Sequence, residues 1–367
     1  MAIKHNADNE RIKHKYLGFL EQAKRQDGST VDAVAKAISR FEGYTKHRCF
    51  KAFHYQQAAG FKNHLAKQRN EKTGKPLSMA TMNSTLRALK AFFQWLSREP
   101  GYKSRINYSD AEYFNLSEKG VRIATAKREK PVPTLEQVKQ AIALMPHESD
   151  IELRNRALVA FTLLTGARDS AIASLKLKHV NLDAGSVFQD AREVKTKASK
   201  TFTTVFLPVG SEVREIFSSW VRYLREELLF GNDDPVFPKT KVGLGQAGVF
   251  AADGLTREHW TTAATIRHVF KEAFERAGMP YFNPHSFRNT LATLGMKMCR
   301  NAEEMKAWSQ NLGHSNVMTT FTSYGEVAFG RQAEIIQELH SPKPSSTVED
   351  MGEFARVLVR EMKNVEV

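Results

Sequence analysis

Three short stretches near the end of the chain read PHSFR (284–288), NLGH (311–314) and VMTTFTSYG (317–325). Proline suits the first turn of a helix, so the first stretch is predicted to begin one. His285 and Arg288 are three residues apart and would lie on one face of that helix. His314 then precedes Tyr324 by ten residues. Each fragment is common by itself, and their order along the chain is the informative feature.

Two further elements lie upstream of these stretches. Arg168 follows an apolar helix that is predicted from Ile151 to Leu164 and is stopped by Gly166. Two candidate strands, Ser186–Asp190 and Thr201–Leu207, then flank a lysine-rich turn. The whole ordered set is arginine, lysine, His-x-x-Arg, Gly-His and tyrosine, which is an uncommon combination.

With these motifs in this order, the chain resembles the tyrosine recombinase family, which includes phage and genomic-island integrases. LRALKAFFQWL (86–96) is similar to the family's helical core-binding domain. The resemblance implies a mainly helical fold with a small antiparallel β-sheet in the catalytic domain. It also implies a two-domain, C-shaped clamp around duplex DNA, without a cofactor or a metal.

The chemistry accounts for the residue types. Attack on a phosphodiester builds negative charge on the nonbridging oxygens, which the guanidiniums of Arg168 and Arg288 are predicted to neutralise. Tyr324 is the predicted nucleophile, and its phosphotyrosine bond would let strands rejoin without ATP. His285 is predicted to give acid–base help to Tyr324, and His314 to hydrogen-bond a nonbridging oxygen.

The leaving 5′-oxygen needs a proton, which a lysine on a β-hairpin turn provides in the family. This turn contains Lys195, Lys197 and Lys200. Counting back from the second strand favours Lys197, and the other two lysines are alternatives or phosphate contacts. Many family members also carry an acidic residue three positions after the first arginine. This sequence has Ala171 there, and Asp169 is a candidate substitute.

Positive charge is concentrated in the first third of the chain. Residues 1–130 hold 26 Lys and Arg against 12 Asp and Glu, which accounts for the whole net charge of +14. Such a segment attracts a polyanion, although a solvated basic surface or acidic lipid would fit as well. A predicted helix, Met79–Glu99, would bury an apolar stripe and leave Arg87 and Lys90 for phosphate.

The predicted domains are a basic helical DNA-binding domain (1–120), a linker (121–133), a catalytic domain (134–340), and a second linker with a C-terminal helix (341–367). Thr134 and Gln137 form a capping box that would open the catalytic domain. The C-terminal helix is amphipathic, so it would fold back on its own domain or dock on a neighbouring protomer. Residues 1–30 fit the first helix of the basic domain better than an extra arm-type DNA-binding element.

Several features argue against other protein classes. No run approaches the length of a membrane span, the N-terminus lacks a secretory signal, and a cytoplasmic protein is expected. Cys49 and Cys299 are predicted to be two buried thiols, with neither a disulfide framework nor a zinc-ligand spacing. His179 is predicted to be a surface histidine at a helix end.

The resemblance therefore implies a site-specific DNA recombinase that acts through a 3′-phosphotyrosyl intermediate and integrates or excises a mobile element. The expected partners are double-stranded DNA with attachment-type sites and three further copies in a homo-tetramer. The sequence is silent on whether accessory DNA-bending proteins are needed. The alternatives are chromosome or plasmid dimer resolution, a type IB topoisomerase, and a non-catalytic accessory DNA-binding protein.

Overall fold

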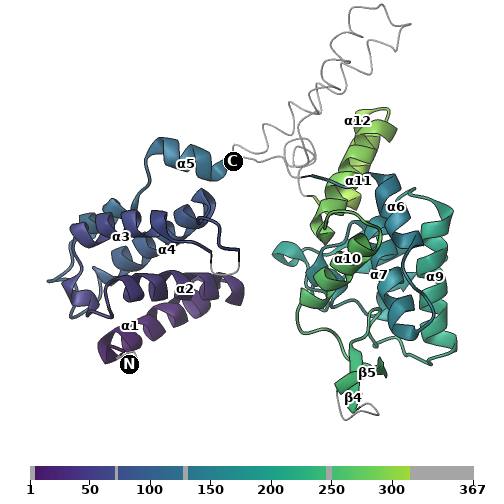
Figure 1. Ribbon diagram of the computed structural model, residues 1–367, viewed down its shortest axis with the longest axis horizontal. Helices are drawn as coiled ribbons and strands as arrows, with labels where there is room; N and C mark the ends of the chain where they lie inside the picture. Colours follow the sequence, from purple (N-terminus) through teal and green to yellow (C-terminus); the bar gives the residue numbers. More distant parts are fainter. Residues whose placement is uncertain (1–4, 71–72, 127–130, 245–249, 315–367) are drawn as a thin grey trace, which may run out of the picture. The chain divides into compact units, whose positions relative to one another are not determined.

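The computed structural model describes residues 5–70, 73–126, 131–244 and 250–314. The chain divides into two compact units, Met1–Arg128 and Glu129–Val367 (Figure 1). Tyr324, the segment 341–367 and residues 127–130 of the predicted linker lie outside the described residues. The predicted fold class is confirmed, because the described elements are mostly helices with two small antiparallel sheets.

The named elements in the described part of the N-terminal unit are all helices, and Arg69 and Pro76 form one isolated antiparallel bridge. Its elements are α1 (Ala7–Gly18), η1 (Phe19–Ala23), α2 (Gly28–Tyr44), η2 (Phe50–Ala52), α3 (Tyr55–Lys67), α4 (Met79–Leu96), η3 (Tyr108–Phe114) and α5 (Glu118–Thr125). Ile12, Tyr16 and Leu20 belong to the core of this unit, so residues 7–23 are built into it as its first helix. Helix α5 begins at a cap in which Ser117 accepts from the backbone N–H of Gly120, and it extends five residues into the predicted linker.

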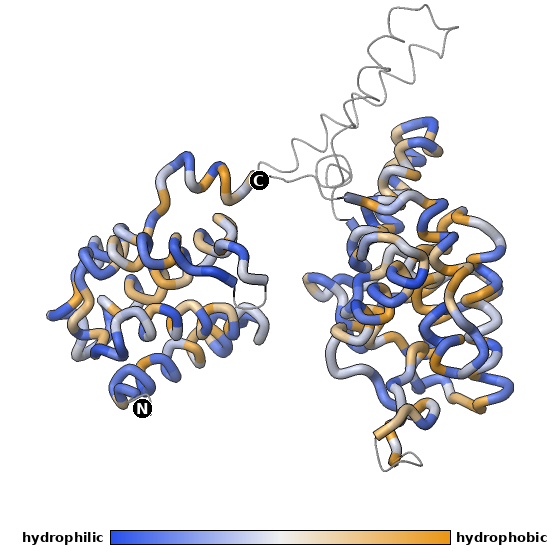
Figure 2. The backbone as a smooth tube through the Cα atoms, in the orientation of Figure 1, coloured by the Kyte–Doolittle hydropathy of each residue, from blue (hydrophilic) through white to orange (hydrophobic). Residues whose placement is uncertain are grey.

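Helix α4 is the centre of this core. Its predicted stripe is confirmed, since Leu86, Leu89, Phe93 and Leu96 are 0–1% exposed. The ring of Phe93 stacks on that of Phe53 at 3.7 Å between centroids. Figure 2 shows hydrophobic and hydrophilic residues alternating along the helices of both units, as amphipathic helices require.

The C-terminal unit combines helices with the two sheets. Its elements are α6 (Leu135–Ala143), α7 (Asp150–Thr165), α8 (Asp169–Ile172), η4 (Leu177–His179), β1 (Val180–Asn181), β2 (Ser186–Gln189), η5 (Lys197–Ser199), β3 (Phe202–Val205), α9 (Ser211–Glu226), β4 (Thr240–Leu244), β5 (Phe250–Leu255), α10 (Ala264–Arg276), α11 (Pro284–Met298) and α12 (Ala302–Asn311). The capping box at the start of α6 is confirmed, with both Thr134–Gln137 hydrogen bonds present.

Helix α7 lies at the centre of this unit. Residues 157–165 are all buried, and the helix packs against α6, α9, α10 and α11. It ends at Gly166, which adopts the left-handed φ of 60° that suits glycine. One sheet has the strand order β1-β2-β3, which leaves β3 at an edge. The ribbon β4–β5 was not predicted, and Figure 1 shows it at the lower end of the unit, beyond the helices.

Candidate active site

Arg288 lies at the centre of the candidate site. Asn283 caps α11 by accepting from the backbone N–H of Ser286, which fixes the first turn and the arginine one turn later. The Arg288 side chain is 2% exposed, and its Nη1 donates to the carbonyl of Gly166 at 2.5 Å. Its Nη2 donates to the carbonyl of Leu312 at 2.5 Å and to Nε2 of His314 at 2.8 Å. Arg288 therefore joins the end of α7 to the turn after α12.

His314 is neutral in this arrangement. Burial first, and then positive charges around it, lower the pKa of His314 to about 3; the charged groups are Arg288, Arg168, Lys200 and His285. Because its Nε2 accepts from Arg288, we assign the ring proton to Nδ1. The structure thus brings together the two predicted arginines, both predicted histidines and one of the hairpin lysines.

The low pKa of His314 predicts a pH dependence of stability. The unfolded chain protonates this histidine near 6.5, whereas the folded protein does so only at about 3. The free energy of unfolding should therefore fall as the pH drops from 6.5 toward 3, by up to about 1.4 kcal/mol per pH unit from this group. Urea unfolding of the wild type and of His314→Gln between pH 7 and pH 5 measures it. Equal slopes for the two proteins would contradict a neutral His314.

Arg168 and His285 approach the same cluster from two other elements. Arg168 is the half-buried residue that precedes α8, two residues after Gly166, so the turn at the end of α7 sets its position. His285 is exposed in the first turn of α11. Both belong to the charges that act on His314. An imidazole can act as an acid or a base near neutral pH, and His285 lies at the surface of this cationic cluster, which suits an acid–base role.

The turn at Gly166 gives a stability test with a matched control. A Cβ at Gly166 would lie 2.8 Å from Leu312 Cδ2 and 3.1 Å from Leu291 Cδ1. Gly278 has a similar φ of +68°, but a Cβ there would meet nothing within 4 Å. Both alanine variants carry the backbone strain, whereas Gly166→Ala should cost a further roughly 1–3 kcal/mol for overpacking. Equal urea midpoints for the two variants would show that the Leu312 contact is unimportant.

The structure distinguishes among the three hairpin lysines. Lys200 is half-buried, and its Nζ donates to the backbone carbonyl of His314 at 3.3 Å. Lys197 is exposed on the short turn η5. Lys195 is also exposed, and its backbone N–H is held by Ser174 Oγ at 2.9 Å. Counting back from the strand favoured Lys197, but the lysine that lies beside His314 is Lys200.

The sequence matches the phage integrase family over residues 132–331, which is more than half of the chain. The chain belongs to this family of tyrosine recombinases. It is therefore a site-specific recombinase. Tyrosine recombinase XerC of Halalkalibacterium halodurans is 22% identical over 89% of this chain and 95% of its own. Tyrosine recombinase XerC of Lactobacillus delbrueckii subsp. bulgaricus is 23% identical over 84% and 92%.

Solved structures support the same fold. A lambda integrase dimer bound to a COC′ core site matches with a TM-score of 0.59 at 12% identity, covering 92% of this chain and 99% of that one. The Tn1549 transposon integrase in complex with transposon right end DNA matches with a TM-score of 0.57 at 16% identity, over 90% and 99%. The two-unit architecture is therefore one that recombinases of this family adopt.

The recombinase places Asp169 against α10. Its Oδ2 accepts from Arg267 at 3.1 Å (Nε) and 2.7 Å (Nη2), and its Oδ1 accepts from the backbone N–H of Ser170. Ala171, at the position that is acidic in many relatives, is 1% exposed and packs in the core. The carboxylate next to Arg168 thus fastens α8 to α10.

The prediction that His179 is a surface histidine is wrong. Its ring is buried, with Nε2 at 2.9 Å from Glu193 Oε2 and Nδ1 accepting from the backbone N–H of Lys176. Lys178 also binds Glu193, at 2.9 Å, and this bond is the largest cause that lowers the pKa of that carboxyl. Because Glu193 lies between β2 and β3, these contacts hold the start of the lysine hairpin against η4.

The two predicted DNA contacts on α4 differ in their surroundings. Arg87 is exposed. Lys90 Nζ binds Glu112 Oε2 at 2.6 Å and Asn115 Oδ1 at 3.1 Å, so it is engaged in a network with η3. Of the pair, Arg87 is the better placed to meet a phosphate.

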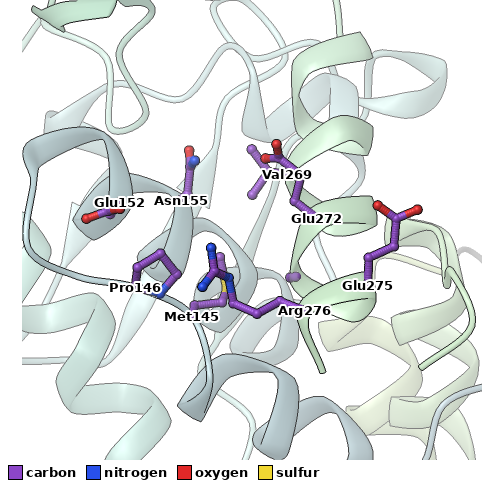
Figure 3. Close-up of a pocket in the computed structure, with 9 residues that line it drawn as sticks. Met145, Pro146, Glu152, Asn155, Val269, Glu272, Glu275 and Arg276 are labelled. Carbon is purple, nitrogen blue, oxygen red and sulfur yellow. The ribbon is translucent and has the colours of Figure 1, made fainter. Parts of the chain in front are cut away.

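A cavity of about 460 Å³ lies elsewhere in the C-terminal unit, between the end of α6, the start of α7 and α10 (Figure 3). Met145, Val269, Glu272 and Arg276 contribute to its wall, and none of the predicted site residues does.

No helix in the described part of the chain is long and apolar enough to cross a membrane. The ranges that the structure covers contain no group of His, Cys, Asp and Glu that could hold a metal ion. Both cysteines are free and half-buried, so the prediction of buried thiols is wrong.

Proposed function

We propose that this recombinase cleaves and rejoins double-stranded DNA through a 3′-phosphotyrosyl bond to Tyr324. The observation that carries the proposal is the cluster around His314, which gathers four other side chains of the family's catalytic types. Tyr324 follows this cluster by ten residues in the sequence. The solved relatives that share the fold are bound to DNA, which supports the same partner here.

Each group has a role that its surroundings suit. Arg288 and Arg168 neutralise the nonbridging oxygens as charge develops on them. Neutral His314 donates its Nδ1–H to one of these oxygens, while its Nε2 accepts from Arg288, which fixes the ring. His285 accepts the proton of Tyr324. Lys200 donates a proton to the leaving 5′-oxygen, and we prefer it to Lys197 because it lies beside His314.

The basic N-terminal unit is proposed as the core-binding domain, with Arg87 on a phosphate-facing surface. Together with the catalytic unit it would form the family's clamp around duplex DNA. We also propose that four copies assemble on DNA and that the C-terminal segment 341–367 docks on a neighbouring copy. Accessory DNA-bending proteins would assist only if the attachment site must be bent. The expected location is the cytoplasm.

The proposed biological role is integration and excision of a mobile element, which the likeness to a transposon integrase supports. Dimer resolution is the second role, and it is kept because the curated relatives are named recombinases rather than integrases. Both roles use the same strand exchange. They differ in the DNA that the protein selects.

One experiment tests the activity and finds the site. The protein is incubated in EDTA with sheared genomic DNA of its host, the reaction is stopped with detergent, and covalently trapped DNA is sequenced. Adducts enriched at one sequence would support the proposal, whereas DNA that is bound but never trapped would contradict it. Sites that flank a discrete segment favour a mobile element, and a single chromosomal site favours dimer resolution.

A further inference from the structure

Strand β3 lies at the edge of its sheet, and a side chain from α12 covers the edge that no strand pairs with. On its other side β3 pairs with β2, with Val205 opposite Ser186. Backbone groups on the outer side of an edge strand need a partner. At Val205 both are satisfied by one side chain: the Val205 N–H donates to Asn311 Oδ1 at 2.7 Å, and Asn311 Nδ2 donates to the Val205 carbonyl at 2.8 Å.

A third hydrogen bond joins Asn311 to β3. The hydroxyl of Thr204 donates to the backbone carbonyl of Asn311 at 3.1 Å. Asn311 therefore does for β3 what a further strand would do. An amide is the side chain that suits this task, because it offers one acceptor and one donor side by side.

The three hydrogen bonds between Asn311 and β3 lie a short way along the chain from both Lys200 and His314. Asn311 is the last residue of α12 and precedes His314 by three residues. Val205 follows Lys200 by five residues in the same strand and turn. Gly313, between Asn311 and His314, has a φ of +73°, and a Cβ there would lie 2.5 Å from Cζ of Phe202 in β3. The hairpin and the histidine turn are therefore packed together at two points.

We propose that Asn311 is a positioning residue that sets Lys200 for proton donation to the leaving 5′-oxygen. This inference rests on the proposed function. In the cleavage step the Tyr324 oxygen forms a bond to phosphorus and its proton passes to His285. The bond from phosphorus to the 5′-oxygen breaks, and that oxygen takes a proton from the Lys200 ammonium, which becomes an amine. Asn311 touches none of the reacting atoms and acts only through β3.

A sulfur substitution separates this role from general support of the fold. When the 5′-bridging oxygen is replaced by sulfur, the leaving group is a thiolate. A thiol has a pKa of about 8.5, against about 15.7 for water, so it leaves without an acid. Substitution of a residue that acts only by positioning the general acid should then no longer slow cleavage.

The test uses a duplex of the trapped genomic site, with either oxygen or sulfur at the cleaved position. We expect Asn311→Leu to slow cleavage of the oxygen duplex by roughly ten- to a hundredfold, as loss of an orienting group does elsewhere. On the sulfur duplex it should be within about threefold of the wild type, since positioning then has no effect. Lys200→Ala should show a larger loss, with the same recovery.

Trp308→Phe is the matched control on α12. It removes the bond from Trp308 Nε1 to the carbonyl of Leu291, 3.0 Å, without touching β3. Any slowing that it causes should be the same on both duplexes. Asn311→Asp keeps the acceptor for Val205 N–H but not the donor, and it replaces Asn311→Leu if that variant fails to fold.

The outcomes separate the two proposals. Equal slowing of the Asn311 variants on both duplexes would overturn the positioning role while leaving the recombinase chemistry intact. Failure of sulfur to restore Lys200→Ala would show that this lysine is not the acid, and the inference about Asn311 would fall with it. Absence of any covalent adduct from the wild type on the sulfur duplex would instead sink the proposed function.

Discussion

Tyr324→Phe should bind the trapped genomic site as tightly as the wild type and form no covalent adduct with it. The phenylalanine ring keeps the size of the side chain but has no oxygen to attack phosphorus. Loss of a nucleophile lowers the rate by at least roughly a thousandfold. Without an attacking oxygen, no negative charge develops on the phosphate for the remaining cations to stabilise. Gel shift in EDTA measures binding, and a denaturing gel with a nicked duplex measures the adduct.

Tyr281→Phe is the matched control for this experiment. Tyr281 is 44% exposed and lies three residues before Pro284, close to the catalytic cluster in sequence. Burial is the largest cause that raises the pKa of its hydroxyl, so it is less ready to ionise than an ordinary tyrosine. We expect Tyr281→Phe to keep forming the adduct. Adduct formation by Tyr324→Phe would mean that another side chain is the nucleophile.

Local sequence patterns predicted much of the helical framework. The capping box at Thr134, the apolar stripe of α4 and the glycine that ends α7 all depend on residues within a few positions of one another. Such patterns state which residues face the core and where a helix begins or ends. The residues His285, Arg288 and His314 were found differently, from the order of short motifs along the chain and the resemblance to a known family that this order carries.

Contacts between distant segments could not be predicted. Asn311 meets Val205 across 106 residues, and nothing in the sequence around either one specifies the other. The choice of Lys200 over Lys197 depends on the turn between β2 and β3, where Ala198 and Ser199 adopt positive φ. The ribbon β4–β5 was missed because TKVGLGQAGVFAADGL (240–255) is rich in glycine and lacks regular alternation. His179 is buried with Glu193 as its hydrogen-bond partner, and the residues next to His179 give no sign of this contact.

Arg288→Lys should lose both activity and stability. A lysine keeps the charge but cannot reach Gly166 O, Leu312 O and His314 Nε2 at once. Removing one preorganised donor from a transition state lowers the rate by about 10²–10³-fold. Unsatisfied buried acceptors should cost roughly 1–3 kcal/mol of unfolding free energy each. Cleavage of the nicked duplex, measured well below the melting temperature, and urea unfolding test the two effects.

Arg154→Lys separates the two effects of Arg288→Lys. Arg154 is equally buried, 2% exposed, and its Nη1 donates to the Pro238 carbonyl at 2.8 Å and to Thr240 Oγ1 at 2.9 Å, at the base of the ribbon. The same substitution there should destabilise the unit by a similar amount, yet leave the cleavage rate within about threefold, since Arg154 belongs to a structural contact. If both variants cleave equally fast, Arg288 is a structural arginine only. If only Arg288→Lys is slow, the guanidinium that joins α7 to the His314 turn also acts on the phosphate.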